Sequence, residues 1–154
     1  MGIIRFALFA PLGHYWAIAN THWDVIHAHH ELQGGLFNPA ITSGERIAAK
    51  WGTFAYFWNF AIFIPCFWFL PPMNLPIAAT DTLVAVYISM ATHYQTALVP
   101  HSKSRCSDAH GWQRAPGANE SFFDAAARLN TTVTSPEATC GSYVREWQYG
   151  VSIS

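Results

Sequence analysis

The chain has 154 residues, of which 51% are hydrophobic and 11% are charged, and its formal net charge is −1. The charged share lies well below the roughly 25% of soluble domains, so the composition favours a single domain in a membrane, with the lipid bilayer as its partner. Nucleic acid is excluded as a partner, because the sequence offers no cluster of lysine and arginine that would bind phosphates.

Residues 3–21 form the first apolar stretch and predict a helix that reaches across part or all of a membrane. Pro11 and His14 weaken it as a span. The stretch has one basic residue and bulky aromatic side chains near its end, unlike a cleaved signal peptide, so we expect it to remain in the mature protein. Residues 20–31, which are rich in histidine, predict a loop or an interfacial helix.

The strongest membrane signal lies at residues 51–70, which carry no charge and ten aromatic rings. At about 1.5 Å per residue, a helix of this length spans roughly 30 Å, the thickness of a bilayer's hydrocarbon core. Thr42 and Glu45 have the spacing of a capping box, and Pro71 cannot continue a helix, so we expect a helix over residues 43–70. Cys66 would be a small packing residue inside it.

Residues 76–99 predict a third helix, which begins at Pro76 and ends before Pro100. The short connection to the preceding helix requires the two to pack as an antiparallel hairpin. Together these patterns predict an all-α fold: a polytopic membrane bundle of three to four helices, in a single domain over residues 1–154.

Residues 101–140 are polar and predict a long extramembrane loop. N-glycosylation sequons begin at Asn119 and Asn130 and indicate a loop that faces the lumen or the cell exterior. Cys106 and Cys140 bracket this loop; in an oxidising compartment they can form a disulfide, and two unpaired thiols are the alternative. Residues 142–154 are too few to span, so they predict a partial fourth helix or an interfacial segment.

This order of helices, with a long cysteine-bearing loop before the last one, resembles the fungal MARVEL-type tetraspan membrane proteins. The residues that carry the resemblance lie in the three apolar helices, in the loop and in the last segment: Arg5, Phe6, residues 50–70, Thr80, Asp81, Thr82, Leu83, His101, Ser102, Cys106, Cys140, Tyr143, Trp147, Gln148 and Tyr149. The first segment is more polar, and the last one shorter, than in that family.

The resemblance implies a non-catalytic protein of the plasma membrane or secretory pathway that organises membrane microdomains or assists vesicle trafficking. We expect no cofactor. Sterols, other membrane proteins and a second copy of the chain are further candidate partners.

Histidines concentrate after the first apolar stretch, where they form a candidate metal site with one carboxylate: His22, His27, His29, His30 and Glu31. On a helix, His27 and Glu31 share a face, which makes a zinc or copper site geometrically feasible. The alternative is a polar interfacial segment whose histidines titrate at about pH 6.5.

Asp81 is the one charged residue of the third helix, and a carboxylate at mid-bilayer costs roughly 2.5–3.5 kcal/mol. It is either a functional group or an interfacial residue near the start of its helix. In an enzyme, His14, Asp81 and His93 would be the catalytic candidates and would line one deep polar pocket.

Two further interpretations therefore stand beside the tetraspan. One is a small membrane enzyme, of oxygenase or cyclase type, that acts on a lipophilic natural product through histidine bases or metal ligands. The other is a soluble helical protein with the apolar helices as its core.

Overall fold

The computed structural model describes residues 2–33, 36–63, 65, 74–112, 114, 118–131, 133 and 135–154. Within these ranges the chain forms helices and no strand, which confirms the all-α class. In chain order the elements are α1 (Gly2–Ala28), η1 (His30–Leu32), α2 (Pro39–Phe63), α3 (Asn74–Thr96), η4 (Lys103–Asp108), α4 (Phe122–Leu129) and α5 (Pro136–Ile153).

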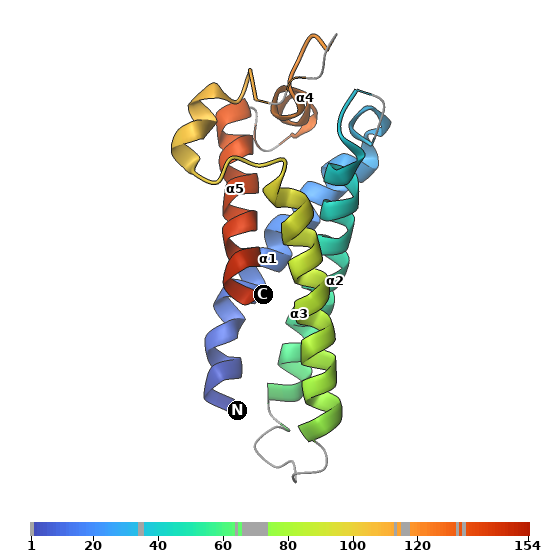
Figure 1. Cartoon of the computed structure of the whole chain (residues 1–154), viewed down its shortest axis with the longest axis vertical. Helices are drawn as coiled ribbons and strands as arrows, with labels where there is room; N and C mark the ends of the chain where they lie inside the picture. The colour runs from blue at the N-terminus through green and yellow to red at the C-terminus, as the bar shows by residue number, and fades with distance from the viewer. Residues whose placement is uncertain are drawn as a thin grey trace.

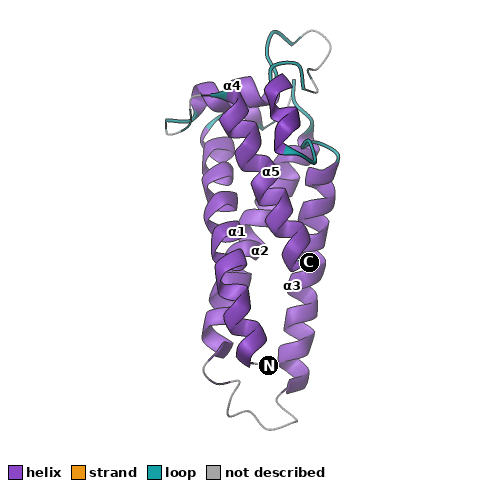
Figure 2. Cartoon of the chain, turned by 90° about the vertical axis from the view of Figure 1, so that its left-hand side faces the viewer, coloured by secondary structure: helices purple, strands orange, loops and turns teal. Residues whose placement is uncertain are grey.

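Three long helices, α1, α2 and α3, follow the long axis of the molecule, and α5 runs beside them for part of that length (Figure 1). Helix α5 starts at the end that carries α4, and the C-terminus lies about halfway along the bundle in both views (Figures 1 and 2). We call the end with α5, α4 and η4 the capped half. The open half comprises residues 2–14 of α1, 52–63 of α2 and 74–88 of α3.

Helix α1 continues to Ala28, beyond the predicted end at residue 21, and so includes most of the histidine-rich segment. Within this helix, the polar side chain of Asn20 is hydrogen-bonded inside the bundle. Its Nδ2 donates to the carbonyl oxygen of Trp16 at 2.8 Å and to Oγ1 of Thr53 in α2 at 3.0 Å. A polar residue that is hydrogen-bonded to a neighbouring helix need not end its own.

Helix α2 begins at Pro39, before the start predicted from the capping box. The Oδ1 of Asn38 accepts a hydrogen bond from the amide of Ala40 at 3.0 Å. Glu45 lies in the second turn and is buried in the protein core, so the capping-box prediction was wrong. The described part of α2 ends at Phe63, and the predicted end at residue 70, Cys66 and Pro71 lie outside the described residues.

A stripe of small buried residues lets α2 approach its neighbours closely: Gly44, Ala48, Gly52 and Ala55. A Cβ at Gly44 would lie 3.1 Å from Cβ of Tyr94 in α3, and one at Gly52 would lie 3.1 Å from the Tyr15 ring in α1. Small residues at these positions are therefore required for the packing of α1, α2 and α3.

Helix α3 runs from Asn74 to Thr96, close to the predicted range of 76–99. In the described ranges it is the one helix that is both long enough and apolar enough to cross a membrane. The structure thus supports one candidate span, where the sequence predicted three to four.

Residues 101–140 are not a loop throughout. They form η4, α4 and the first turn of α5, and buried side chains of α4 and α5 pack together: Phe122, Phe123, Ala126, Tyr143 and Val144. Apolar residues on one face of α4 explain why this short helix docks on α5. Helix α5 has 18 residues and starts at Pro136, so the partial helix predicted from residue 142 was too short.

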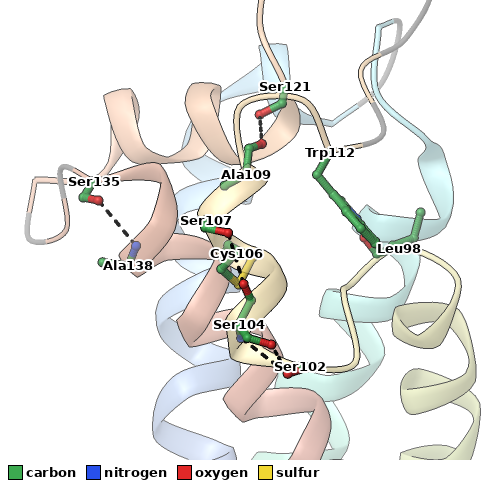
Figure 3. Close-up of a disulfide and its surroundings, with 11 residues drawn as sticks. Leu98, Ser102, Ser104, Cys106, Ser107, Ala109, Trp112, Ser121, Ser135 and Ala138 are labelled. Carbon is green, nitrogen blue, oxygen red and sulfur yellow. Dashed lines mark hydrogen bonds between the residues drawn. A yellow bond between two sulfur atoms is a disulfide. The ribbon is translucent and has the colours of Figure 1, made fainter.

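The predicted disulfide is present. Cys106 of η4 is bonded to Cys140 of α5 (Figure 3). Nearby, Nε1 of Trp112 donates to the carbonyl oxygen of Leu98 at 2.9 Å, and the Ser121 hydroxyl donates to the carbonyl oxygen of Ala109 at 2.8 Å. These bonds tie the segment between α3 and α4 to the end of the bundle.

Candidate metal centre

Four polar side chains meet inside the capped half, one from each of four helices. They are His22 of α1, Glu45 of α2, Gln95 of α3 and Glu146 of α5, and none is more than 5% exposed. Charged and titratable side chains are seldom fully buried unless they are paired or bind a metal. We call these four residues the polar layer.

Helix periodicity brings Glu146 into the layer. The buried face of α5 follows the three-to-four-residue spacing of a helix and consists of Thr139, Cys140, Tyr143, Val144, Glu146 and Gly150. On α2 the same spacing places Glu45 on the buried face with Ala48 and Ala49. Both carboxylates therefore occupy positions at which an apolar residue is the usual choice.

The polar layer is linked across all four helices. The Nε2 of Gln95 donates to Oε1 of Glu45 at 2.9 Å and to Oε1 of Glu146 at 2.8 Å. The Nδ1 of His22 makes a short contact with Oε2 of Glu146 and lies 3.8 Å from Oε2 of Glu45. One ligand atom from each of His22, Glu45 and Glu146 falls within 4.8 Å of the others, so a single ion can contact all three.

The second ring nitrogen of His22, Nε2, also has a hydrogen-bond partner. Its Nε2 lies 2.9 Å from Oγ of Ser142, and the ring stacks on Tyr143 with the centroids 3.7 Å apart. A hydrogen bond at one ring nitrogen sets which nitrogen is free to bind an ion. With Nε2–H donated to Ser142, the lone pair of Nδ1 points into the polar layer.

Burial sets the protonation states. It lowers the pKa of His22 to about 4 and raises the pKa of Glu146 to about 7. A neutral imidazole can accept at Nδ1 a hydrogen bond from the carboxyl of Glu146, which is partly protonated near neutral pH. A divalent ion in this place would displace that proton and bind the same two atoms.

Three buried oxygen atoms in or beside the polar layer lack a hydrogen-bond partner among the described residues: Oε2 of Glu45, Oε1 of Gln95 and Oη of Tyr15. Tyr15 is fully buried, and its ring is flanked by Gly52 of α2 and Gly150 of α5. Oε1 of Gln95 is a pure acceptor. Burial raises the pKa of Glu45 well above its ordinary value, so the carboxyl that carries Oε2 favours the protonated form. A cation that displaced the protons of the buried carboxyls would gain these oxygens as ligands.

The donor chemistry indicates the class of ion. One imidazole and two carboxylates suit zinc, iron or manganese better than copper(I), which selects sulfur ligands. Metal sites built from inward-facing carboxylates and histidines on several helices are a recurrent feature of helical bundles.

Of the predicted metal ligands, the structure brings only His22 into this site. His27, His29, His30 and Glu31 lie at the end of α1 and around η1, away from the bundle interior. Glu31 there pairs with Arg128 of α4 at 3.2 Å. Within the described part of the chain, His22, Glu45 and Glu146 are the one group with the spacing of metal ligands.

The predicted catalytic trio is not assembled. Asp81 pairs with Arg5 at 2.6 Å, His14 stacks on Tyr149 with the centroids 5.4 Å apart, and His93 is exposed on α3. The cavity that contains Asp81 is lined by neither histidine. The expectation of one polar pocket joining the three residues was therefore wrong.

Both sequon asparagines lie at the capped end. Asn119 is exposed, whereas Asn130 is partly buried, and its Oδ1 accepts a hydrogen bond from the amide of Val133 at 3.2 Å.

The sequence pattern did not indicate Gln95, Glu146 or Tyr15 as site residues, and it gave Glu45 only a capping role. A signal for Glu146 existed, because it interrupts an apolar helical stripe, but its partners lie on other helices and share no spacing with it.

No protein-family model matches the chain, and no curated protein and no solved structure matches it.

Proposed function

We propose that the protein is a membrane-embedded metalloprotein, and that His22, Glu45 and Glu146 bind one divalent transition-metal ion inside the helical bundle. The observation that carries the proposal is the meeting of these ligands from three helices in one buried layer, where Oε2 of Glu45 and Oε1 of Gln95 have no hydrogen-bond partner among the described residues. Gln95 can contribute Oε1 as a further oxygen ligand.

The surroundings of the site limit what else can reach the ion. A cavity of about 10 Å³ touches Glu45, Gln95 and Tyr143, and one of about 40 Å³ touches His22, Ser142 and Tyr143. Such volumes hold a water molecule but no organic substrate. Three protein ligands with water in a further position are the arrangement of metal sites that activate water.

The membrane part of the proposal rests on the open half. Large apolar side chains are exposed along all three of its helices: Ile3, Ile4, Phe6, Phe54, Phe57, Phe60, Leu75, Leu83 and Val86. Arg5 and Asp81 are the only charged residues in these ranges, and they pair with each other. A surface of this kind suits lipid, and the polar layer would then lie on the side of the bundle that leaves the hydrocarbon core.

Metal content is the direct test. The protein is purified in detergent, stripped with chelator, and titrated with Co²⁺ and Zn²⁺, with the absorption of bound Co²⁺ and the metal-to-chain ratio as readouts. We expect one ion per chain. Glu146→Gln keeps the side-chain size and removes a charged ligand, so it should weaken binding at least about tenfold, a change of roughly 1.4 kcal/mol.

The matched control is His29→Ala, which removes a partly buried histidine outside the polar layer. It should leave the stoichiometry and affinity unchanged. Helix content measured by circular dichroism separates loss of a ligand from loss of the fold. The proposal fails if wild-type protein binds no ion, or if Glu146→Gln and His29→Ala behave alike.

A second candidate is the non-catalytic MARVEL-type tetraspan, in which the open half would be completed as a polytopic span and the capped half would face outward. It is favoured by the disulfide, which suits an oxidising compartment. Glycosidase treatment of membrane-fractionated protein tests the orientation: a gel shift that disappears in Asn119→Gln and Asn130→Gln would support an outward capped half. Recovery of the wild type in the soluble fraction would contradict both candidates.

A further inference from the structure

A second internal site lies in the open half, below the end of α5. It is a cavity of about 330 Å³ between α1, α2 and α3, within the size range of small-molecule sites. Its walls are apolar, and they include Leu8, Leu12, Ala55, Val84, Ile88 and Ile153. Side chains of α1, α2 and α3 form most of its lining, and Ile153 of α5 completes it.

Polar groups gather at the opposite end of this cavity, near the start of α1. Arg5 donates to Oδ2 of Asp81 at 2.6 Å and to Oδ1 of Asn59 at 3.5 Å. Trp58 donates from Nε1 to Oδ1 of Asp81 at 2.9 Å, and Asn59 donates from Nδ2 to the carbonyl oxygen of Arg5 at 3.1 Å. We call Arg5, Asn59, Trp58 and Asp81 the polar foot.

The net charge of the polar foot determines whether a charged or an uncharged ligand head group can bind there. Arg5 and Asp81 cancel, so a charged head group would enter an apolar cavity without a counter-charge, at a cost of several kcal/mol. An uncharged hydroxyl or carbonyl group avoids this cost. The Arg5 guanidinium has five N–H donors, and the bonds above engage two of its nitrogens, so it retains donors for such a group.

The length of the cavity limits the length of the ligand that it can hold. From Arg5 to Leu12 on α1, and from Asp81 to Ile88 on α3, seven residues correspond to about 10 Å. We propose that this cavity binds an uncharged lipophile, with a hydroxyl or carbonyl group on the polar foot and an apolar body of about 10 Å along Leu8, Val84 and Ile88.

This site is separate from the metal centre. Ile88 at the top of the cavity and Gln95 in the polar layer are seven residues apart on α3, which is again about 10 Å. A lipophile of this length therefore ends below the polar layer. The inference does not depend on metal binding and can be tested in chelator-treated protein.

The test uses three ten-carbon probes that differ only in the head group: 1-decanol, decane and decanoate. Tritiated 1-decanol is titrated into detergent-purified protein, and the other two compete. We expect one saturable site for 1-decanol per chain, with decane and decanoate at least tenfold weaker. Equal competition by decane, or tighter binding of decanoate, would overturn the proposal, as would the absence of a saturable site.

Two variants locate the site. Ala85→Phe fills the cavity from α3 and should weaken 1-decanol binding at least tenfold, whereas Leu83→Phe adds the same ring at an exposed position of the same helix and should not. Asp81→Asn leaves the charge of Arg5 without a partner, so it should reverse the preference towards decanoate. This gain of anion binding cannot arise from misfolding, and a variant that still prefers 1-decanol would contradict the assignment of the polar foot.

Discussion

The capped and open halves accommodate interior polar groups in different ways. In the capped half four helices surround the axis, and each contributes one side chain to a layer that is closed to solvent. In the open half three helices surround a cavity, and its polar groups form a pair at one end. The cavity is lined mainly by α1, α2 and α3, and Ile153 of α5 borders it.

The two halves differ in the kind of ligand that each can hold. A completed four-helix section can hold ligands rigidly from several directions, which suits a metal ion. A cavity between helices can hold an organic molecule instead. The two halves should also differ in their contributions to stability.

Removal of the disulfide should cause the largest loss of stability. This loss should be confined to the capped half. Cys106 and Cys140 are 34 residues apart, and closing a loop of that length contributes about 4 kcal/mol in the chain-entropy model. Cys140→Ser should therefore lower the free energy of unfolding by roughly this amount, as measured by denaturant titration. Because Cys66 lies outside this pair, Cys66→Ser should keep the sensitivity of wild type to reductant. Identical curves for wild type with and without reductant would contradict the prediction.

The contact of α5 with α3 gives a smaller and sharper test. A Cβ at Gly150 would lie 2.5 Å from Oγ1 of Thr92 and 3.3 Å from the Tyr15 ring, whereas one at Gly141 would meet no atom within 4 Å. Gly150→Ala should destabilise the protein by about 1–3 kcal/mol through overpacking. Gly141→Ala, on the same helix, should stabilise it by roughly 0.5–1 kcal/mol, because alanine is the better helix former.

Thermal unfolding of both variants measures the difference. Opposite signs would show that α5 docks along its described length on α3 and α1. If both glycine variants are stabilised, the end of α5 is not packed against Thr92, and the boundary between the two halves lies elsewhere.

The sequence predicted what depends on local pattern. Hydropathy located α3 to within a few residues, and the two loop cysteines suggested the bond that the structure contains. Prediction from the sequence failed where the position of one residue fits two structural roles. Glu45 has the spacing of a capping box, but its position on the buried stripe of α2 decides its role.

The polar layer could not be predicted, because it depends on how four helices align along the bundle. His22 and Glu146 are separated by 124 residues, and the histidine cluster around His27 and His29 drew attention to the wrong end of the segment. Local sequence shows which face of a helix is buried. It does not show which buried residues of different helices lie at the same level.

The smallest predicted effect concerns the attachment of α4 in the capped half. Asp124 completes a capping box: its Oδ2 accepts a hydrogen bond from the amide of Ser121 at 3.0 Å, its own amide donates to the Ser121 hydroxyl at 3.2 Å, and its Oδ1 contacts His110. Burial raises the pKa of Asp124, but these hydrogen bonds more than offset it and hold the pKa below its ordinary value. Asp124→Ala should therefore cost about 1 kcal/mol at pH 7.

The sign of the pH dependence follows from the lowered pKa of Asp124. The folded state favours the ionised carboxylate, so its contribution is fully present above the unfolded-state pKa of about 4 and is lost as the pH falls through the folded-state pKa. Denaturant titrations at pH 7 and below pH 4 should show the difference between wild type and Asp124→Ala shrinking in acid. Asp24→Ala, at an exposed position of α1, should differ from wild type by less than about 0.5 kcal/mol at either pH. A constant difference for Asp124→Ala across the range would mean that the carboxylate is not held by Ser121, and that α4 is attached to the capped half by its apolar face alone.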